Sequence, residues 1–323
     1  MSDPVLQVRG LKVHYDTPAG VIKAVDGITF DLQRGEKLGL VGESGSGKST
    51  FVLALLRLVM NPGRIRGGQV FLDGIDLLGL SDDEMRHVSG ARISLIPQGA
   101  MNSLNPLMRV KTQMMDTIRA HDKNQSQNAM LEHISKLLQW VGLSPAVADM
   151  YPHELSGGMK QRVCIAMSIT LQPQVIIADE PTSALDVVVQ KQVMETLGHI
   201  QESIGASVIL VGHDMGLMAQ FVDKVGIMYA GRLVEMGPVE EIFENPLHPY
   251  TRLLIGTLPS LETKGVFKGI PGMTPSLLAP PSGCVFHPRC PECTVACTTW
   301  EYDFREVWPG HWVACYVRSN ELA

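Results

Sequence analysis

One stretch decides the fold of this chain: Gly42-Glu43-Ser44-Gly45-Ser46-Gly47-Lys48-Ser49-Thr50. Its pattern, G-x-x-x-x-G-K-S, is typical of a phosphate-binding loop. The apolar residues 37–41 before it predict a buried strand, and residues 51–59 after it predict a helix. In that setting the glycines let backbone N–H groups surround an anion at the positive end of the helix dipole. We therefore expect Lys48 to reach the β- and γ-phosphates of a nucleotide and the Ser49 hydroxyl to ligate Mg²⁺. A Gly/Ser-rich turn that binds nothing is the weaker alternative, because both flanks fit the motif.

Composition sets the class of protein. The chain has 323 residues, of which 45% are hydrophobic and 19% charged, so we expect one large domain with an appendage, or two domains. The formal net charge of -6 disfavours a general nucleic-acid role. The sequence contains no run of about 18 uncharged apolar residues, and Met1–Pro4 does not begin a secretory signal. We therefore expect a cytoplasmic protein that meets a membrane only through partner subunits.

The segments on either side of the loop predict β-structure. Residues 5–9, 11–15 and 28–32 alternate apolar and polar side chains, as half-buried strands do. The dipeptide Asp73-Gly74 lies between two apolar runs and predicts a hairpin turn. Tyr15 lies at the end of its strand, where its ring could stack on a purine, although an ordinary half-exposed strand aromatic is the simpler interpretation.

Residues 99–171 predict a helical insertion between two strands of the core. Apolar residues recur at helical spacing from Met130 through Ile134 to Leu138. Methionines enrich this segment, and they suit either gap-filling in a core or a surface that receives a partner helix.

Three later motifs place polar residues at the ends of structural elements. Ser156-Gly157-Gly158 precedes a predicted helix, so it is either an N-cap or a second anion site. Asp179-Glu180 ends an apolar strand, where Asp179 can hold Mg²⁺ and Glu180 can orient or deprotonate a water molecule. His213 ends another apolar strand and could donate to a γ-phosphate, although a lone histidine there is more often simply exposed.

The order of these motifs resembles the nucleotide-binding subunit of ABC transporters, from residue 5 to about residue 260. The resemblance implies an α/β fold, with a P-loop NTPase core of the ABC ATPase type, an antiparallel β subdomain and a helical subdomain at about 99–171. It implies an ATPase domain at 1–260 and a small cysteine-rich extension at 261–323.

The resemblance also gives each motif a role. It implies that Tyr15 stacks on adenine and that the Walker A loop is formed by Gly42, Ser44, Gly45, Ser46, Gly47, Lys48, Ser49 and Thr50. It implies that Mg²⁺ is held by Ser49, Gln98 and Asp179. It also implies that Ser156, Gly157 and Gly158 close over ATP bound to another subunit, and that Asp186 ends the D-loop at 183–186. Glu180 is then the catalytic base, His213 the switch histidine, and Gln98 the residue that senses the γ-phosphate. Gly99 and Gly212 depart from the family's usual residues but replace no group that does chemistry, so we expect a competent ATPase.

Three segments resemble the dipeptide and oligopeptide importers in particular: Pro97–Pro106, His248–Thr251 and Ile270–Pro291. That group pairs two different ATPase subunits head to tail around two ATPs, with two membrane permeases and an extracytoplasmic solute-binding protein. We therefore expect a peripheral ATPase on the cytoplasmic face of the plasma membrane that powers peptide import, with nickel or oligosaccharide import as alternatives. A non-transport ABC ATPase is disfavoured because the chain has no second cassette, and a subunit that only binds ATP is disfavoured by Glu180 beside Asp179.

Five of the six cysteines crowd the last 40 residues, and in a cytosolic chain such a cluster favours a metal over disulfides. The spacing Cys284-x5-Cys290-x6-Cys297-x17-Cys315 suits Zn²⁺ or an iron–sulfur cluster. Zinc knuckles favour two C-x2-C pairs, and Cys290 with Cys293 forms the one such pair. The family resemblance supports a [4Fe–4S] cluster on Cys284, Cys290, Cys297 and Cys315 that pins a tail with little core. Zinc and no metal remain as alternatives.

Overall fold

The computed structural model describes residues 3–99, 103–183, 185–258 and 269–321. The chain divides into two compact units. The first contains the N-terminal residues up to Leu6, Leu32–Glu36 and Gly79–Val211, and the second contains Gln7–Asp31, Lys37–Leu78 and the residues from Gly212 onward.

Three features expected from the sequence fall outside the described residues. They are the domain boundary at 260/261, residues 100–102 of the importer-like segment, and Ala184 within the D-loop. The boundary therefore stays a prediction. None of the helices within the described ranges combines the length and apolar character that crossing a bilayer requires.

The first unit holds a parallel sheet with the strand order β8-β7-β6. Its strands are β6 (Ile93–Ile96), β7 (Val175–Asp179) and β8 (Ser207–Val211). Val175 is the Cα partner of Ile93 on one side and of Ser207 on the other. β7 and β8 are buried along their whole length, as expected for parallel strands covered on both faces, and this burial explains their unbroken apolar sequences.

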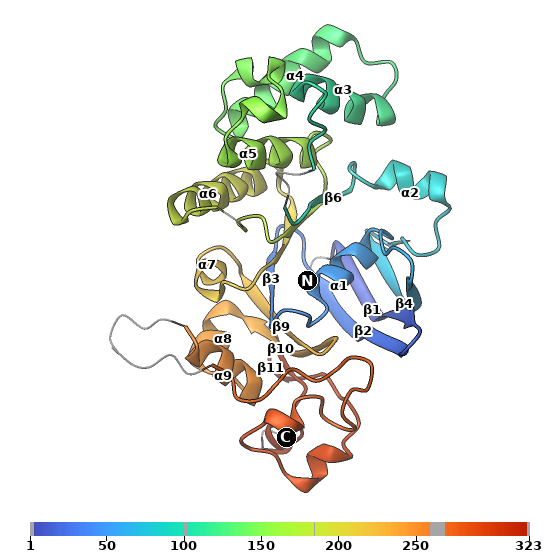
Figure 1. The fold of residues 1–323 in the computed structure, drawn as a ribbon, viewed down its shortest axis with the longest axis vertical. Coiled ribbons are helices and arrows are strands. Elements are labelled where there is room, and N and C mark those ends of the chain that lie inside the picture. The colour runs from blue at the N-terminus through green and yellow to red at the C-terminus, as the bar shows by residue number, and fades with distance from the viewer. Residues whose placement is uncertain (1–2, 100–102, 184, 259–268, 322–323) are drawn as a thin grey trace. The chain divides into compact units, whose positions relative to one another are not determined.

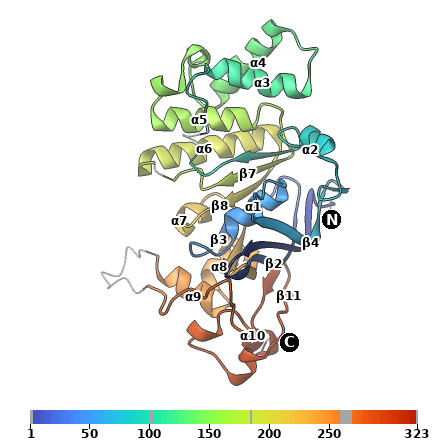
Figure 2. The ribbon, with the colours of Figure 1, turned by 45° about the vertical axis from the view of Figure 1, so that its right-hand side comes forward.

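The helices of the first unit lie within and on either side of residues 99–171, where the sequence predicts a helical insertion. They are α2 (Asp82–Val88), α3 (Val110–His121), α4 (Gln127–Trp140), α5 (Gly157–Ser168) and α6 (Val187–Ile204), with the short turns η2 (Pro145–Asp149) and η3 (Pro152–Glu154). In Figures 1 and 2, α3, α4 and α5 lie together and α6 lies beside α5. Ser126 caps α4, and the helix buries Met130, Ile134 and Leu138, the residues that recur at helical spacing. Met114 in α3 is also fully buried, which favours gap-filling over a partner surface.

The second unit contains an antiparallel sheet with the strand order β2-β1-β4-β5. Its strands are β1 (Leu6–Thr17), β2 (Gly20–Leu32), β4 (Gly63–Leu72) and β5 (Ile75–Asp76). The hairpin predicted at Asp73-Gly74 is confirmed, because both residues have positive φ (53° and 80°) and Leu72 pairs with Ile75. The two strands predicted at 5–9 and 11–15 are instead the single strand β1. Gly10 lies within this strand at φ 58°, a conformation that glycine adopts readily, and its N–H donates to the Thr29 hydroxyl of β2.

A second sheet in this unit joins the core strands to the C-terminal tail. β3 (Lys37–Val41) runs parallel to β9 (Lys224–Tyr229), and β10 (Arg232–Pro238), β12 (His311–Val313) and β11 (Arg305–Trp308) continue it in antiparallel order. The helices are α1 (Lys48–Leu55), α7 (Met215–Ala219), α8 (Val239–Glu244), α9 (Pro249–Gly256) and α10 (Tyr316–Glu321), with the turns η4 (His287–Arg289) and η5 (Val295–Thr298). α8 packs on β9 and β10.

The C-terminal tail shares the core of the second unit. Glu235 of β10 is the Cα partner of Val313, and Val313 packs with Leu247 and Cys315 in a buried apolar cluster. Phe286 is fully buried and packs edge-on against another buried ring, Tyr229, with ring centroids 5.1 Å apart. Strand pairing and apolar packing therefore constrain this tail, where the sequence predicted a metal as the main constraint.

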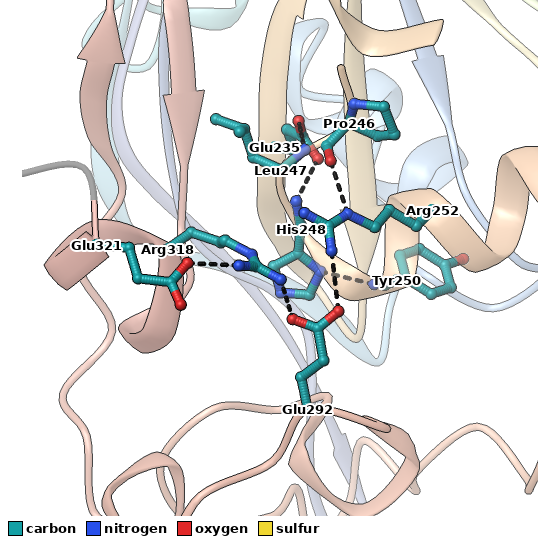
Figure 3. Close-up of polar contacts among 9 residues, drawn as sticks. All are labelled: Glu235, Pro246, Leu247, His248, Tyr250, Arg252, Glu292, Arg318 and Glu321. Carbon is teal, nitrogen blue, oxygen red and sulfur yellow. Dashed lines mark hydrogen bonds and ion pairs between the residues drawn. The ribbon is translucent and has the colours of Figure 1, made fainter. Parts of the chain in front are cut away.

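Polar contacts reinforce the same tail. The buried carboxylate of Glu235 accepts hydrogen bonds from the N–H groups of Leu247 (2.7 Å) and His248 (2.8 Å) (Figure 3). It also lies 2.7 Å from Nε2 of the buried His311. Burying a carboxylate is costly unless hydrogen bonds replace those it made to water. These contacts offset part of that cost, so the Glu235 side chain can remain buried in the core.

Replacing Phe286 by alanine should lower the free energy of unfolding of the second unit by about 3–5 kcal/mol, because it removes a fully buried ring and leaves a cavity. Tryptophan fluorescence during denaturant unfolding measures this, since three of the four tryptophans lie in the tail: Trp300, Trp308 and Trp312. The matched control is Val295→Ala, whose side chain is 88% exposed and should change little. Equal unfolding midpoints for the Phe286 variant and the unsubstituted protein would contradict the proposed packing role.

Candidate nucleotide-binding site

The phosphate loop lies in the second unit, between β3 and α1. Gly47 is the N-cap of α1 in a left-handed conformation, at φ 104°. The Lys48 side chain is largely buried, and its ammonium donates to the carbonyls of Gly42 (2.8 Å) and Glu43 (3.1 Å). The loop predicted from G-x-x-x-x-G-K-S therefore has the strand–loop–helix setting that the motif requires, with its lysine folded over the loop backbone.

Two glycines of the loop allow very close backbone approaches. A Cβ on Gly42 would lie 2.1 Å from the carbonyl oxygen of Met228, and a Cβ on Gly47 would lie 2.1 Å from the carbonyl oxygen of Ala24. Contacts this short are sterically impossible. The loop path is therefore specific for glycine at both positions.

Tyr15 is half-buried near the end of β1, as predicted. Its hydroxyl lies 3.4 Å from the Thr50 hydroxyl of α1, so the two predicted nucleotide-binding residues are neighbours in the second unit. His213 belongs to the same unit, where it is exposed shortly before α7.

In the first unit, the structure brings together Gln98 and Glu180, two residues predicted to act in hydrolysis. Asp179 ends β7 and is buried, while Glu180 follows at φ 47°, with its N–H donating to the Val211 carbonyl (2.9 Å). Nε2 of Gln98 donates to the Glu180 carboxylate at 2.8 Å. The left-handed backbone of Glu180 is uncommon for a residue with a side chain, and it turns the chain sharply at the strand end.

The signature residues begin α5. Ser156 is the N-cap, and its hydroxyl accepts from the Met159 N–H at 3.3 Å, which confirms the predicted cap. Gly158 packs so closely on α6 that a Cβ there would lie 2.8 Å from Cγ1 of Val189. Asp186 is the N-cap of α6 and accepts from the N–H groups of Val188 and Val189. Ser156 and Asp186 are both exposed, so their capping role leaves them at the surface of the unit.

A set of contacts at Glu43 was missed by sequence reasoning. Arg289 donates two hydrogen bonds to the Glu43 carboxylate, at 2.7 and 2.9 Å, and these bonds hold the pKa of that carboxyl below its usual value. The hydroxyl of Thr274 donates to the same carboxylate (3.0 Å), and the hydroxyl of Tyr250 accepts from the Glu43 N–H (2.9 Å). No local pattern signals these contacts, since every partner is more than 200 residues away along the chain.

The predicted metal centre in the tail is not supported. Among the described residues, no group of three or more His, Cys, Asp or Glu side chains is arranged to hold a metal ion. The four predicted ligands are free thiols: Cys284, Cys290, Cys297 and Cys315. Burial raises the pKa of Cys284 to about 12, and the thiols of Cys315, Cys290 and Cys297 also raise it. The Cys284 N–H donates to the Cys297 carbonyl at 2.8 Å. Burial likewise raises the pKa of Cys290 to about 11.

Comparisons with known proteins identify the family. A family profile described as "ABC transporter" matches residues 25–183, and one described as "Oligopeptide/dipeptide transporter, C-terminal region" matches residues 234–297. The oligopeptide transport ATP-binding protein OppD of Escherichia coli (strain K12) is 42% identical over 324 residues, which span 99% of this chain and 95% of that protein. The chain belongs to the OppD/DppD family of ABC transporter ATP-binding proteins.

Other relatives agree with this assignment. The dipeptide transport ATP-binding protein DppD of Caldanaerobacter subterraneus is 44% identical over 288 residues, covering 88% of each chain. A solved dimeric structure of the ATP-binding cassette MJ0796, in a post-hydrolysis state with ADP and Pi, aligns with a TM-score of 0.66 at 26% identity. It covers 72% of this OppD/DppD family member and 98% of that chain. The predicted ABC ATPase fold is therefore confirmed.

Replacing Gly47 by alanine should weaken ATP binding by more than about 100-fold. A left-handed alanine costs about 1–2 kcal/mol, and the added Cβ would also overlap the Ala24 carbonyl, so the loop must move. Isothermal titration with Mg-ATP measures the dissociation constant.

The control is Gly45→Ala, in the same loop. Gly45 also has positive φ (79°), but a Cβ there meets nothing within 4 Å, so this variant should lose no more than about tenfold in affinity. Similar losses for the two variants would show that the close approach at Gly47 is unimportant.

Proposed function

We propose that this chain is the ATP-binding and ATP-hydrolysing subunit of an ABC importer for oligopeptides or dipeptides. One observation carries the proposal: a glycine-specific phosphate loop and a C-terminal region of the oligopeptide/dipeptide transporter type occur in one chain that resembles OppD over nearly its whole length. The matched relatives are named for oligopeptide and dipeptide transport, which supports peptides over nickel or oligosaccharides as the solute.

The predicted ligand set suits Mg-ATP. Ser49, Gln98 and Asp179 are the predicted Mg²⁺ ligands, and their hydroxyl, amide and carboxylate oxygens are the hard donors that this ion prefers. Bound Mg²⁺ would neutralise charge on the β- and γ-phosphates. Lys48 would turn from the loop carbonyls to the phosphates, and Tyr15 would stack on adenine.

Hydrolysis would depend on Glu180 as general base. Its contact with Gln98 supports this role, since the amide holds the carboxylate that would accept a proton from water in one orientation. His213 would donate to the γ-phosphate, at the exposed position it occupies.

The partners follow from the family. The MJ0796 cassette is dimeric in two solved structures. We infer that this chain pairs head to tail with a second ATPase subunit, so that Ser156, Gly157 and Gly158 of each cover the ATP held by the other, with Asp186 alongside. Two permeases would hold the pair at the cytoplasmic face of the membrane, and a solute-binding protein would deliver the peptide from outside.

Replacing Glu180 by glutamine should lower ATP hydrolysis by the assembled transporter at least about 100-fold while leaving ATP binding intact. The amide cannot take a proton from water, yet it keeps an oxygen that can accept from Gln98. Phosphate release by the purified complex measures hydrolysis. Glu202→Gln, at an exposed position of α6, is the control and should hydrolyse ATP normally. Unchanged turnover in the Glu180 variant would remove its role as base.

The metal content of the tail stays a prediction from the sequence. The backbone hydrogen bond between Cys284 and Cys297 (2.8 Å) supports a [4Fe–4S] cluster, while the absence of a metal-holding arrangement among the described residues speaks against it. A cluster predicts about four iron and four sulfide per chain, with visible absorbance, in anaerobically purified protein.

Ligand variants test the same idea. Cys297→Ser should abolish the bound iron, whereas Cys293→Ser, at the exposed spare cysteine, should keep it. Zinc without iron would replace the cluster by a zinc site, and protein without either metal would exclude both.

A further inference from the structure

Every polar group of Glu43, the second residue of the phosphate loop, makes at least one hydrogen bond. Its N–H donates to Tyr250, its carbonyl accepts from Lys48 and from the Ser46 N–H, and its carboxylate accepts from Thr274 and Arg289. Three of these partners come from the region beyond residue 249, which lies outside the core motifs of an ATPase. The C-terminal region therefore fixes the first turn of the loop.

Arg289 provides the strongest of these contacts. Its side chain is 4% exposed, and its two terminal nitrogens meet the two carboxylate oxygens of Glu43 in a fork. The remaining donors are also used, because Nε donates to the Pro271 carbonyl (2.8 Å) and Nη1 to the Tyr229 hydroxyl (3.2 Å). A buried, fully hydrogen-bonded guanidinium has one orientation, so it can hold Glu43 in one position.

The Arg289 guanidinium packs against a cluster of aromatic rings. Tyr229, Tyr250 and Phe286 are all fully buried, and their ring centroids are 4.6 to 5.3 Å apart. The guanidinium lies 5.7 Å from the Tyr229 ring and 6.0 Å from the Phe286 ring, which adds cation–π attraction. Tyr229 belongs to the core strand β9, so the arginine is anchored to the sheet that also contains β3.

We propose that Arg289 is a positioning residue for ATP, which acts from the C-terminal region by fixing and neutralising Glu43 in the phosphate loop. The inference rests on the proposed ATPase function. Two physical effects act together. The fork keeps the start of the loop in one conformation, and its positive charge cancels a carboxylate that would otherwise repel a triphosphate. An unpaired Glu43 would weaken binding of the nucleotide and of the transition state alike, and so raise KM more than it lowers kcat.

A second anchor of the same segment provides a control. Glu292 accepts from Arg252 of α9 (2.9 Å) and from Arg318 of α10, and Arg318 also pairs with Glu321 (Figure 3). Arg252 additionally donates to the Pro246 carbonyl at 2.9 Å. This network ties the tail to α9 only three residues after Arg289, but none of these contacts reaches the loop. Its loss should therefore loosen the tail without changing Glu43.

The test compares ATP binding by full-length variants. Arg289→Gln should raise the dissociation constant for Mg-ATP about tenfold, because a charge-assisted buried fork is lost. Arg289→Lys, which keeps the charge but not the fork, should lie between this variant and the unsubstituted chain. Glu292→Gln should stay within about twofold. In the assembled transporter, the Arg289→Gln variant should show a raised KM for ATP with kcat changed little, whereas mere loss of folded protein would lower kcat and leave KM unchanged.

A double variant tests whether Arg289 acts through Glu43. Removing the carboxylate as well, in Glu43→Gln with Arg289→Gln, should restore part of the lost affinity, since no uncompensated charge then faces the triphosphate. The proposal is overturned if Arg289→Gln binds ATP as the unsubstituted chain does, if Glu292→Gln loses as much affinity, or if the double variant binds no better than Arg289→Gln. Failure of the proposed function would appear differently, as absence of ATP hydrolysis by the unsubstituted complex.

Discussion

The phosphate loop depends on how closely its backbone approaches the strands beside it. At Gly42 and at Gly47 a side-chain carbon would overlap the carbonyls of Met228 and Ala24, which belong to β9 and β2. Backbone contacts therefore fix the loop at both positions. The side chains within the loop can then bind the ligand or make contacts with residues outside the loop. A loop fixed in this way can present its N–H groups to an anion without first rearranging, which is the basis of its affinity.

Local signals predicted most of the fold and the local structure around several candidate site residues. The hairpin at Asp73-Gly74, the capped helix at Ser156 and the buried strand that ends at Asp179 were each specified by a few adjacent residues, so their prediction required no knowledge of the tertiary structure. The prediction of two strands at 5–9 and 11–15 was wrong because Gly10 interrupts the apolar–polar alternation, whereas a glycine at positive φ can remain within one strand. The Glu43–Arg289 pair spans 246 residues and leaves no periodic trace, so only the structure reveals it.

In the cysteine-rich tail, the spacing of the cysteines does not indicate what stabilises the folded segment. Four thiols in a proline-rich segment suggest that a metal must replace a missing core. In the structure, β12 pairs with β10, Val313 packs against Leu247 and Cys315, and Phe286 packs against two buried tyrosine rings. The tail therefore has apolar and hydrogen-bonded reasons to fold that do not involve its thiols, and any metal would add to an anchored segment.

This anchoring explains why a tail beyond the ATPase motifs can matter to the nucleotide. A glycine-rich loop loses more conformational entropy on ordering than other sequences, so its binding conformation needs support that its own residues cannot give. The helix α1 supplies that support at Lys48, while at the other end Glu43 is gripped by Tyr250, Thr274 and Arg289. A rigid fork costs little further entropy, because the guanidinium is already packed on the rings beneath it. The C-terminal region is then a structural part of the phosphate site, and a change in how the tail packs would reach the loop through the three contacts at Glu43.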